Sequence, residues 1–405
     1  MERSYPVFTV TKKAEMSIKS GHPWLYGEEV TDVSGEYGNG DIVDVRSAKG
    51  SYLGSGYVND NSKIRVRVIS NNANDRFDKA FYQRQVKYAI DYRRQVMGED
   101  FSNCRLIFGE ADRMPGLTVD RFGGILVIQS LCLGTDMRKH IIIPLIVDYL
   151  RELGESIDAV FERNDVAIRE LEGMEQYKAF YDMPGLKSDL DGHVEINENG
   201  IRYDVDYING QKTGFFLDQK YNRLAVKKLA KGRNVLDCFT HTGAFALNAA
   251  LGGAESVTAV DISASAIELA KANAARNGIN MDFITADVFD LLTELAAKKS
   301  RDYDFIILDP PAFTKSGATA KNAYRGYKEI NMKAMSLLPR GGYLATCSCS
   351  HFMYDDMFRS MLNEAARDVN VTLRRIEARQ QSPDHPVLTT VRETEYLKFY
   401  LFQVV

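Results

Sequence analysis

The pattern of apolar and polar positions changes twice along the 405-residue chain, which suggests three parts. In residues 1–75, short apolar runs alternate with glycine turns. This pattern predicts a small β-barrel domain over residues 1–75. Strands are expected at Pro6–Val10, Asp41–Arg46, Tyr52–Tyr57 and Ile64–Ile69. In the last of these, Lys63, Arg65 and Arg67 share one face, which is either a solvated surface or a stripe that contacts phosphates.

After the polar segment 70–74, residues 77–97 have helical spacing, and helix and strand patterns then alternate. No nucleotide-binding glycine loop follows any of these strands. Residues 76–190 are therefore predicted to form a central α+β domain. Strands are expected at Cys104–Phe108, Gly116–Asp120, Gly124–Leu131 and Ala159–Glu162, and a helix at Lys139–Leu150.

The last part, residues 191–405, contains four apolar runs that each end in an aspartate. Asp237, Asp261, Asp287 and Asp309 are separated by 24, 26 and 22 residues, the length of a strand plus a crossover helix. This repeat predicts a doubly wound, Rossmann-like α/β domain with a parallel sheet. Ligands of such sheets bind beyond the carboxyl ends of the strands, where all four acids are expected.

The turn after the first of these strands, 237–245, has a single glycine, Gly243, which disfavours a pyrophosphate ligand. S-adenosylmethionine fits the pattern better. Its amino group could bond to Asp237 or the adjacent loop, its ribose to Asp261 and its adenine amine to Asp287. A protein that binds another nucleotide is the alternative.

The sequence Asp309-Pro-Pro-Ala-Phe313 follows the fourth strand. Pro310 and Pro311 stiffen the backbone, while Asp309 and Phe313 offer a hydrogen bond and a stacking face. These features favour a planar base as substrate. The alternative is that the segment is an ordinary strand-to-loop turn with no role in binding. Beyond it, phosphate contacts and a solvated surface are alternative roles for Lys315, Lys321 and Arg325.

The fifth strand, expected at Tyr343–Ser350, carries Cys347 and Cys349 on one face if it is extended throughout. A thiolate that adds to carbon 6 of a pyrimidine makes carbon 5 nucleophilic enough to take a methyl group. Buried packing is the alternative, and it is the role expected of Cys104, Cys132 and Cys238.

Composition excludes several classes of protein. The charges, 51 Lys+Arg against 55 Asp+Glu, give a net charge of −4, so charge alone does not indicate RNA binding. Apolar runs are too short to span a membrane, the N-terminus does not resemble a signal peptide, and five scattered cysteines form neither a disulfide framework nor a zinc motif. We expect a soluble, cytoplasmic protein with reduced thiols and no bound metal.

Taken together, these motifs resemble the RlmI-like bacterial 23S rRNA (cytosine-5-)-methyltransferases, and the similarity covers nearly the whole chain. It rests on the segments Gly21-His-Pro-Trp24, 106–121, 211–223, Asp309-Pro-Pro-Ala-Phe313 and Ser348-Cys-Ser350. The resemblance implies a PUA RNA-binding domain, a central α+β domain and a class I methyltransferase domain that uses S-adenosyl-L-methionine.

The resemblance also implies the site residues. Cys349 is the expected nucleophile with Asp309 beside it, although the Thr346-Cys-Ser348 context of Cys347 resembles other RNA cytosine-5 methyltransferases. Pro310, Pro311, Phe313, Lys315 and Arg325 are expected to contact substrate. The cofactor pocket is expected to be formed by Thr213, Gly214, Phe215, Phe216, Asp218, Gln219, Asp237, Phe239, Thr240, Gly243, Asp261, Ile262, Asp287, Val288 and Asp309.

The expected reaction begins when Asp309 bonds N3 of an unstacked cytosine and the cysteine adds to carbon 6. The base that removes the carbon 5 proton stays open, since His351 has no feature beyond its proximity to Cys349. The expected partner is RNA, 23S rRNA in particular, with neither DNA nor a membrane, and a homodimer is one open alternative for the oligomeric state. Two rivals are an rRNA methyltransferase that acts on guanine N7 or another nitrogen without a thiol, and a non-catalytic RNA-binding or ribosome-assembly factor.

Overall fold

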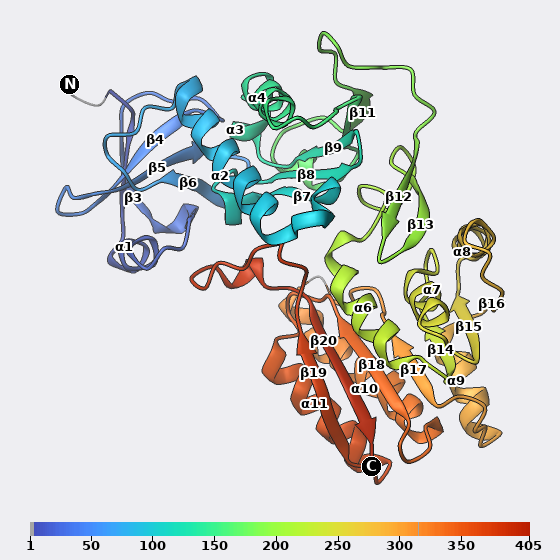
Figure 1. Cartoon of the computed structure of the whole chain (residues 1–405). Helices are drawn as coiled ribbons and strands as arrows, with labels where there is room; N and C mark the ends of the chain where they lie inside the picture. The colour runs from blue at the N-terminus through green and yellow to red at the C-terminus, as the bar shows by residue number, and fades with distance from the viewer. Residues whose placement is uncertain (1–3, 315) are drawn as a thin grey trace. The chain divides into compact units, whose positions relative to one another are not determined.

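The computed structural model describes residues 4–314 and 316–405, which form two compact units (Figure 1). The first unit comprises the chain up to Ile196 together with Asp204–Leu217 and Pro383–Thr394. The second unit comprises Asn197–Tyr203, Asp218–Ser382 and Glu395–Val405. The domain boundaries that the sequence predicts at residues 75 and 190 stay predictions.

The first unit begins with a six-stranded sheet of order β2-β6-β5-β4-β1-β3. All four strands expected in this region are confirmed within one residue at each end, and their apolar side chains, such as Phe8, Val43 and Val66, form one buried core. The short β2 and the largely exposed β3 were not expected, because neither has a long buried apolar pattern. The elements are β1 (Val7–Val10), α1 (Lys12–Lys19), β2 (Trp24–Tyr26), η1 (Gly27–Glu29), β3 (Val30–Ser34), β4 (Ile42–Ser47), β5 (Tyr52–Val58) and β6 (Ile64–Ser70).

A second sheet, of order β11-β10-β9-β8-β7, completes the first unit. Its strands pair antiparallel except for β9 and β10, and α2 packs against α4 and β7. The expected alternation of helices and strands is confirmed. The elements are α2 (Lys79–Met97), η2 (Gly98–Ser102), β7 (Asn103–Phe108), η3 (Gly109–Asp112), β8 (Leu117–Phe122), β9 (Ile125–Ser130), α3 (Leu133–Asp136), α4 (Lys139–Glu152), β10 (Ala159–Asn164), α5 (Ile168–Leu171) and β11 (Tyr177–Phe180).

A hairpin of β12 (His193–Glu198) and β13 (Ile201–Asp206) follows. Its two-residue turn, Asn199-Gly200, has positive φ at both positions, 57° and 86°. This is the geometry of a type I′ turn, for which Asn-Gly is the favoured sequence.

The second unit is built on a seven-stranded sheet of order β16-β15-β14-β17-β18-β20-β19. The five strands from β16 to β18 run parallel, and β20 lies antiparallel to both β18 and β19. Helices α9, α10 and α11 bury one core against this sheet, while α7 packs against β14, β15 and α6. The strands are β14 (Asn234–Cys238), β15 (Ser256–Asp261), β16 (Asp282–Thr285), β17 (Phe305–Leu308), β18 (Tyr343–Ser348), β19 (Leu373–Arg379) and β20 (Lys398–Val404).

The helices of this unit match the crossover pattern that the spacing of the aspartates predicts. The predicted doubly wound sheet is confirmed, and the C-terminal strand pairs within it. No helix among the described residues is both long and apolar enough to cross a lipid bilayer. The remaining elements are η4 (Leu217–Gln219), α6 (Lys220–Leu229), α7 (Ala244–Leu251), α8 (Ala264–Arg276), α9 (Val288–Ala297), η5 (Gly317–Thr319), α10 (Ala320–Leu337), α11 (Asp355–Asp368) and η6 (Arg392–Thr394).

Two expected strand ends are wrong. β16 ends at Thr285, so Asp287 does not end a strand but caps α9 by accepting hydrogen bonds from Phe289 N and Asp290 N. β18 ends at Ser348 rather than Ser350, because its ladder with β20 stops at the Ser348–Lys398 pair. In both places the sequence pattern continues beyond the last hydrogen-bonded pair of residues, so the pattern alone predicted each strand two residues too long.

Helix α6 is anchored by an ion pair within the second unit. Arg223 Nε and Nη2 donate to the two carboxylate oxygens of Glu198 at 2.6 and 2.8 Å, and both side chains are almost fully buried. A buried charge that loses its partner costs about 3–5 kcal/mol, whereas an exposed pair contributes about 0–1 kcal/mol.

We therefore expect Glu198→Gln to lower the free energy of unfolding by about 3–5 kcal/mol, because it removes the carboxylate that binds the buried Arg223 guanidinium group. Urea denaturation followed by circular dichroism measures the change. The matched control is Glu268→Gln, whose partner Lys271 lies 2.8 Å away on an exposed surface. Equal shifts for the two variants would contradict the assigned role of the buried pair.

Candidate functional site

The sheet of the second unit reverses its winding between β14 and β17, which makes this the place where a doubly wound fold binds its ligand. Asp237, near the end of β14, is fully buried. Its Oδ2 accepts hydrogen bonds from the Thr240 hydroxyl at 2.6 Å and from Ala246 N at 2.9 Å. Its Oδ1 is buried and has no hydrogen-bond partner in the described part of the chain. A buried acceptor without a partner is costly, so this oxygen is suited to receive a donor from a ligand.

Burial raises the pKa of Asp237 to about 7, and the nearby charges of Asp309 and Asp261 add to the effect. The pKa of Asp309 is raised to about 7 in the same way, first by burial and then by the charge of Asp218. Gln219 Nε2 donates to Asp309 Oδ1 at 2.9 Å. Near neutral pH both carboxyl groups therefore exchange protons readily, and each can donate or accept a hydrogen bond.

The loop after β14 is held in a strained conformation. Phe239 and His241 both have positive φ, 63° and 50°, which is uncommon for residues with side chains. Gly243 has φ 81°, and a Cβ atom there would lie 3.1 Å from the Cβ of Ala270 in α8. The single glycine of this turn is therefore required both by the backbone and by close helix packing.

The other predicted cofactor acids make local hydrogen bonds. Asp261, at the end of β15, accepts from His241 N and Ser263 N, both at 2.9 Å. It thereby fixes the strained loop. Ile262 after it is exposed, whereas Val288, after the capping residue Asp287, is buried.

The two neighbouring thiols lie in different environments. Cys347 is fully buried within β18, opposite Phe399 of β20, and burial raises its pKa well above the usual range. Cys349 lies beyond the strand end and is only partly buried, with its Sγ 3.8 Å from the carbonyl oxygen of Pro310. The expected strand ends before Cys349, so the expectation that it carries both thiols on one face is wrong, while Cys104, Cys132 and Cys238 are buried as expected.

Lys398, which the sequence analysis missed, lies next to Cys349. It is buried, and its Nζ donates to the carbonyl oxygens of Ser350 and Tyr396, both at 2.7 Å. Burial lowers the pKa of Lys398 to about 8, an effect that negative charge on Cys349 opposes. The signal in the sequence is a single lysine at the start of an otherwise apolar strand, since a charged residue is rarely buried there without a partner.

The predicted substrate residues follow β17. Pro310 is buried and Pro311 exposed, while Phe313 is half-buried with its ring centroid 4.5 Å from that of Tyr327. Lys321 and Arg325 are exposed four residues apart on α10, so they share one helix face. Lys315 lies outside the described residues.

The predicted cofactor loop 213–219 is divided between the units. In the first unit, the buried Thr213 donates its hydroxyl hydrogen to Asp120 Oδ2 at 2.6 Å, and Gly214 has φ 120°. Phe215 is buried and Phe216 lies under Lys212 Nζ, 4.6 Å from the ring centroid. Asp218 and Gln219 belong to the second unit, where Tyr396 donates its hydroxyl hydrogen to Asp218 Oδ2 at 2.6 Å.

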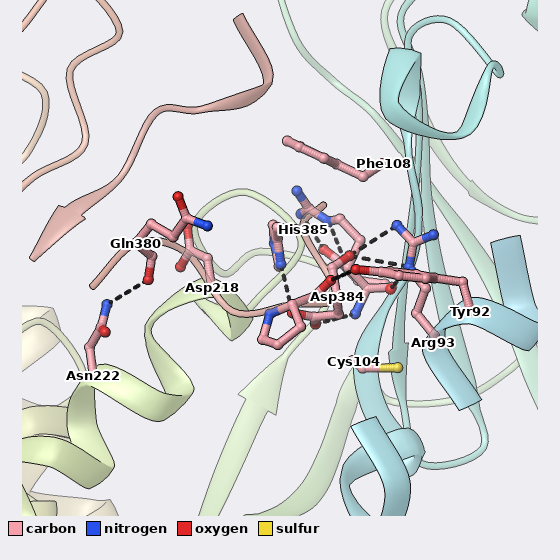
Figure 2. Close-up of polar contacts among 12 residues, drawn as sticks. Tyr92, Arg93, Cys104, Phe108, Asp218, Asn222, Gln380, Asp384 and His385 are labelled. Carbon is pink, nitrogen blue, oxygen red and sulfur yellow. Dashed lines mark hydrogen bonds and ion pairs between the residues drawn. The ribbon is translucent and has the colours of Figure 1, made fainter. Parts of the chain in front are cut away.

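The segment around Asp384-His385 was given no role from sequence, and the structure places it in the first unit. Figure 2 shows the fully buried Arg93, whose Nη2 donates to the carbonyl oxygen of Asp384 at 3.0 Å. Arg105 N donates to Asp384 Oδ2 at 2.8 Å, and His385 Nδ1 lies 2.9 Å from Asp384 Oδ1. Asp384 and His385 are therefore structural residues that fix this segment on α2 and β7.

Comparison with known proteins identifies the family. Residues 176–403 match the profile of S-adenosylmethionine-dependent methyltransferases, and residues 8–71 match a PUA-like domain. The chain is 35% identical over 404 residues to ribosomal RNA large subunit methyltransferase I of Klebsiella pneumoniae strain 342, covering 99% of this chain and 98% of that protein. The protein of the same name from Pseudoalteromonas atlantica is 38% identical over 394 residues, covering 96% and 97%. The chain belongs to the ribosomal RNA large subunit methyltransferase I family.

Solved structures show the same fold for this methyltransferase. A SAM-dependent methyltransferase from Streptococcus mutans superimposes with a TM-score of 0.81 at 21% identity, covering 98% of this chain and 99% of that one. A methyltransferase in complex with SAH has a TM-score of 0.82 at 21% identity, with the same coverage. The family profiles thus confirm the PUA-like domain, the methyltransferase domain and its cofactor S-adenosylmethionine, and the solved structures confirm the Rossmann-like fold, all of which the sequence predicts.

The methyltransferase site fits this cofactor by its own chemistry. The Oδ1 atom of Asp237 needs a donor, and Asp237, Asp261 and Asp287 lie at or just beyond the carboxyl ends of three adjacent parallel strands. A ligand that carries an ammonium group, ribose hydroxyls and an adenine amine offers donors to all three acids. The individual assignments to these atoms stay predictions.

We expect Asp237→Asn to raise the melting temperature at pH 8 and to weaken binding of S-adenosylmethionine. The folded-state pKa of about 7 exceeds the ordinary aspartate value of 3.8, so the folded form binds more protons between these values, and the wild type loses stability as pH rises through this window. The neutral asparagine does not undergo this loss. Differential scanning fluorimetry of the variant and the wild type at pH 5 and pH 8 measures the difference in melting temperature. A difference that does not shrink at pH 5 would contradict the raised pKa of Asp237.

Proposed function

We propose that this methyltransferase forms 5-methylcytosine in 23S rRNA, with Cys349 as the nucleophile. The observation that carries the proposal is the pair of thiols. Cys349 lies partly exposed beside the Asp309-Pro310-Pro311 turn, whereas Cys347 is enclosed in the sheet. An N-methyltransferase needs no thiol beside its substrate turn. The relatives are named as methyltransferases of large-subunit ribosomal RNA, and this, together with the PUA-like domain, supports an RNA substrate.

Bound S-adenosylmethionine supplies the electrophilic methyl group. Asp237 would hold its amino group and Asp261 its ribose, with Asp287 near the adenine. The loop residues Phe239, Thr240 and Gly243 and the side chains of Ile262 and Val288 would complete the pocket in the second unit. We propose that six residues of the 213–219 loop also line the cofactor pocket: Thr213, Gly214, Phe215, Phe216, Asp218 and Gln219.

The chemical steps follow from two side chains. The Cys349 thiolate adds to carbon 6 of cytosine, which moves electron density to carbon 5 and lets that carbon take the methyl group. Protonated Asp309 donates a hydrogen bond to N3 and offsets the negative charge that develops on the ring. A base then takes the proton from carbon 5, the electron pair of that C–H bond re-forms the C5–C6 double bond, and the C6–S bond breaks to restore the cysteine.

The surroundings of Cys349 support this role. The cationic Lys398, held by the carbonyl oxygens of Ser350 and Tyr396, favours a thiolate at the neighbouring cysteine. Tyr327 and Ser350 share a hydrogen bond of 2.9 Å that fixes the backbone after Cys349. Pro310, Pro311 and Phe313 would frame the base, while Lys315, Lys321 and Arg325 would meet RNA phosphates.

We expect Cys349→Ala to abolish formation of 5-methylcytosine, and Cys347→Ala to retain it within a few-fold, because only the former removes an accessible thiol. The assay is mass spectrometry of nucleosides from 23S rRNA after incubation with labelled S-adenosylmethionine. Cys347→Ala is the matched control, since it makes the same change two residues away. A methylated base other than 5-methylcytosine that survives both substitutions would overturn the thiol mechanism.

We expect the activity of Asp309→Asn, divided by that of the wild type, to rise with pH through about 7. The wild-type carboxyl group loses its donated proton there, whereas an asparagine amide donates at every pH. The ratio cancels the ionisation of the cysteine and should increase about tenfold between pH 6 and pH 8 for a group with this pKa. Single-turnover methylation across this range measures it, and a flat ratio would contradict proton donation by Asp309.

A further inference from the structure

A groove of about 590 Å³ lies within the first unit, where the PUA-like sheet meets helix α2. Its walls are the end of β6, the polar segment 70–75, one face of α2 and the turn that ends at Arg113. The volume lies in the range of pockets that bind small ligands. We call it the linker groove, and no residue of the proposed methylation site lines it.

The polar segment 70–75 is a fixed structure rather than a flexible linker. Ser70 Oγ donates to Asp75 Oδ2 at 2.6 Å and accepts from Asn72 N at 3.0 Å. Asn72 Oδ1 in turn accepts from Asn74 N at 3.0 Å. Because these side chains satisfy the backbone locally, one wall of the groove is organised before any ligand arrives.

The charged side chains that line the groove have a net positive charge, with two arginines against one aspartate. Arg84 Nη2 lies 2.8 Å from Asp75 Oδ1, and Arg113 Nη1 donates to Asn71 Oδ1 at 3.1 Å. Arg113 also has a positive φ of 56°, which is uncommon for a residue with a long side chain. Each guanidinium group has five N–H donors, so these contacts leave donors for an anion.

An exposed aromatic ring lines the same groove. Tyr88 is four residues after Arg84 on α2, and 62% of its surface is exposed. Tyr92, on the next turn of the same face, donates its hydroxyl hydrogen to the carbonyl oxygen of Pro383 at 3.1 Å, which holds its side chain in place. Aromatic rings and arginines side by side are the means by which proteins stack unpaired bases and bind the adjoining phosphates.

We propose that the linker groove is an RNA subsite that holds an unpaired nucleotide, with its base stacked on Tyr88 and its phosphate bound by Arg84 and Arg113. The polar lining favours a nucleotide over an apolar peptide, and the net positive charge favours an anion. The arginines on β6 are ion-paired too, Arg65 with Asp60 and Arg67 with Glu172, but neither lines the groove. The inference rests on the proposed RNA substrate and adds a contact that lies outside the methylation site.

The test is fluorescence anisotropy of a short labelled single-stranded oligoribonucleotide with the full-length protein. We expect Tyr88→Ala to weaken binding by roughly 5- to 100-fold, and Tyr88→Phe, which keeps the ring, to bind like the wild type. Arg84→Gln should weaken binding and flatten its dependence on salt, because one phosphate contact is lost. The matched controls are Arg94→Gln, an exposed arginine on the same helix, and Leu171→Ala, which removes another exposed side chain of the same unit.

The proposal is overturned if Tyr88→Ala binds within twofold of the wild type, or if Arg94→Gln loses as much affinity as Arg84→Gln. Thermal unfolding shows whether each variant is folded, and alanine at an exposed helix position should not destabilise the chain. Cys349→Ala separates the two proposals, since it should bind the oligoribonucleotide normally and lose methylation. If the protein binds RNA through Tyr88 but methylates no RNA, the proposal for the linker groove stands and the proposed function is refuted.

Discussion

The second unit depends on one constraint, which is that β14 and β17 are adjacent parallel strands at the point where the sheet reverses its winding. This arrangement brings Asp237 and Asp309 to the same poorly hydrated edge and raises the pKa of both to about 7. The strained loop of Phe239 and His241 and the hydrogen bonds from Thr240 and Gln219 are arranged around these two acids. In the proposed function, Asp237 binds the cationic cofactor and Asp309 donates a hydrogen bond to the base, and these interactions offset the cost of burying the two carboxyl groups.

The C-terminal strand, β20, contributes to the proposed site through its pairing with β18. β20 lies antiparallel between β18 and β19, so the last strand of the chain is an interior strand of the sheet. This insertion encloses Cys347 opposite Phe399 and places Lys398 beside the backbone that follows Cys349. Two thiols that are neighbours in sequence thus acquire different chemistry. One is kept protonated by burial, whereas the other is partly exposed next to a cation.

The first unit shows that overall charge is a poor guide to RNA binding. A net charge of −4 suggests little affinity for a polyanion, yet the charged side chains that line the linker groove are two arginines and one aspartate. The polar segment 70–75, which sequence composition marks only as a linker, is a network of side-chain hydrogen bonds that forms a wall of the linker groove. Local arrangement, rather than total charge, decides where a phosphate can bind.

The sequence by itself determined the parallel strands of the second unit, the doubly wound sheet that they form and the acids near its carboxyl edge, because these follow from short-range periodicity and from the spacing of strand-end aspartates. It also determined the family, since several specific motifs occur together. Only the tertiary structure decided that Asp287 caps a helix, that β18 ends before Cys349 and that Lys398 is buried beside that cysteine. It also decided that Asp384 and His385 belong to the first unit. The physical reason is that burial, the last hydrogen bond of a ladder and the partner of a charge all depend on residues far away in sequence.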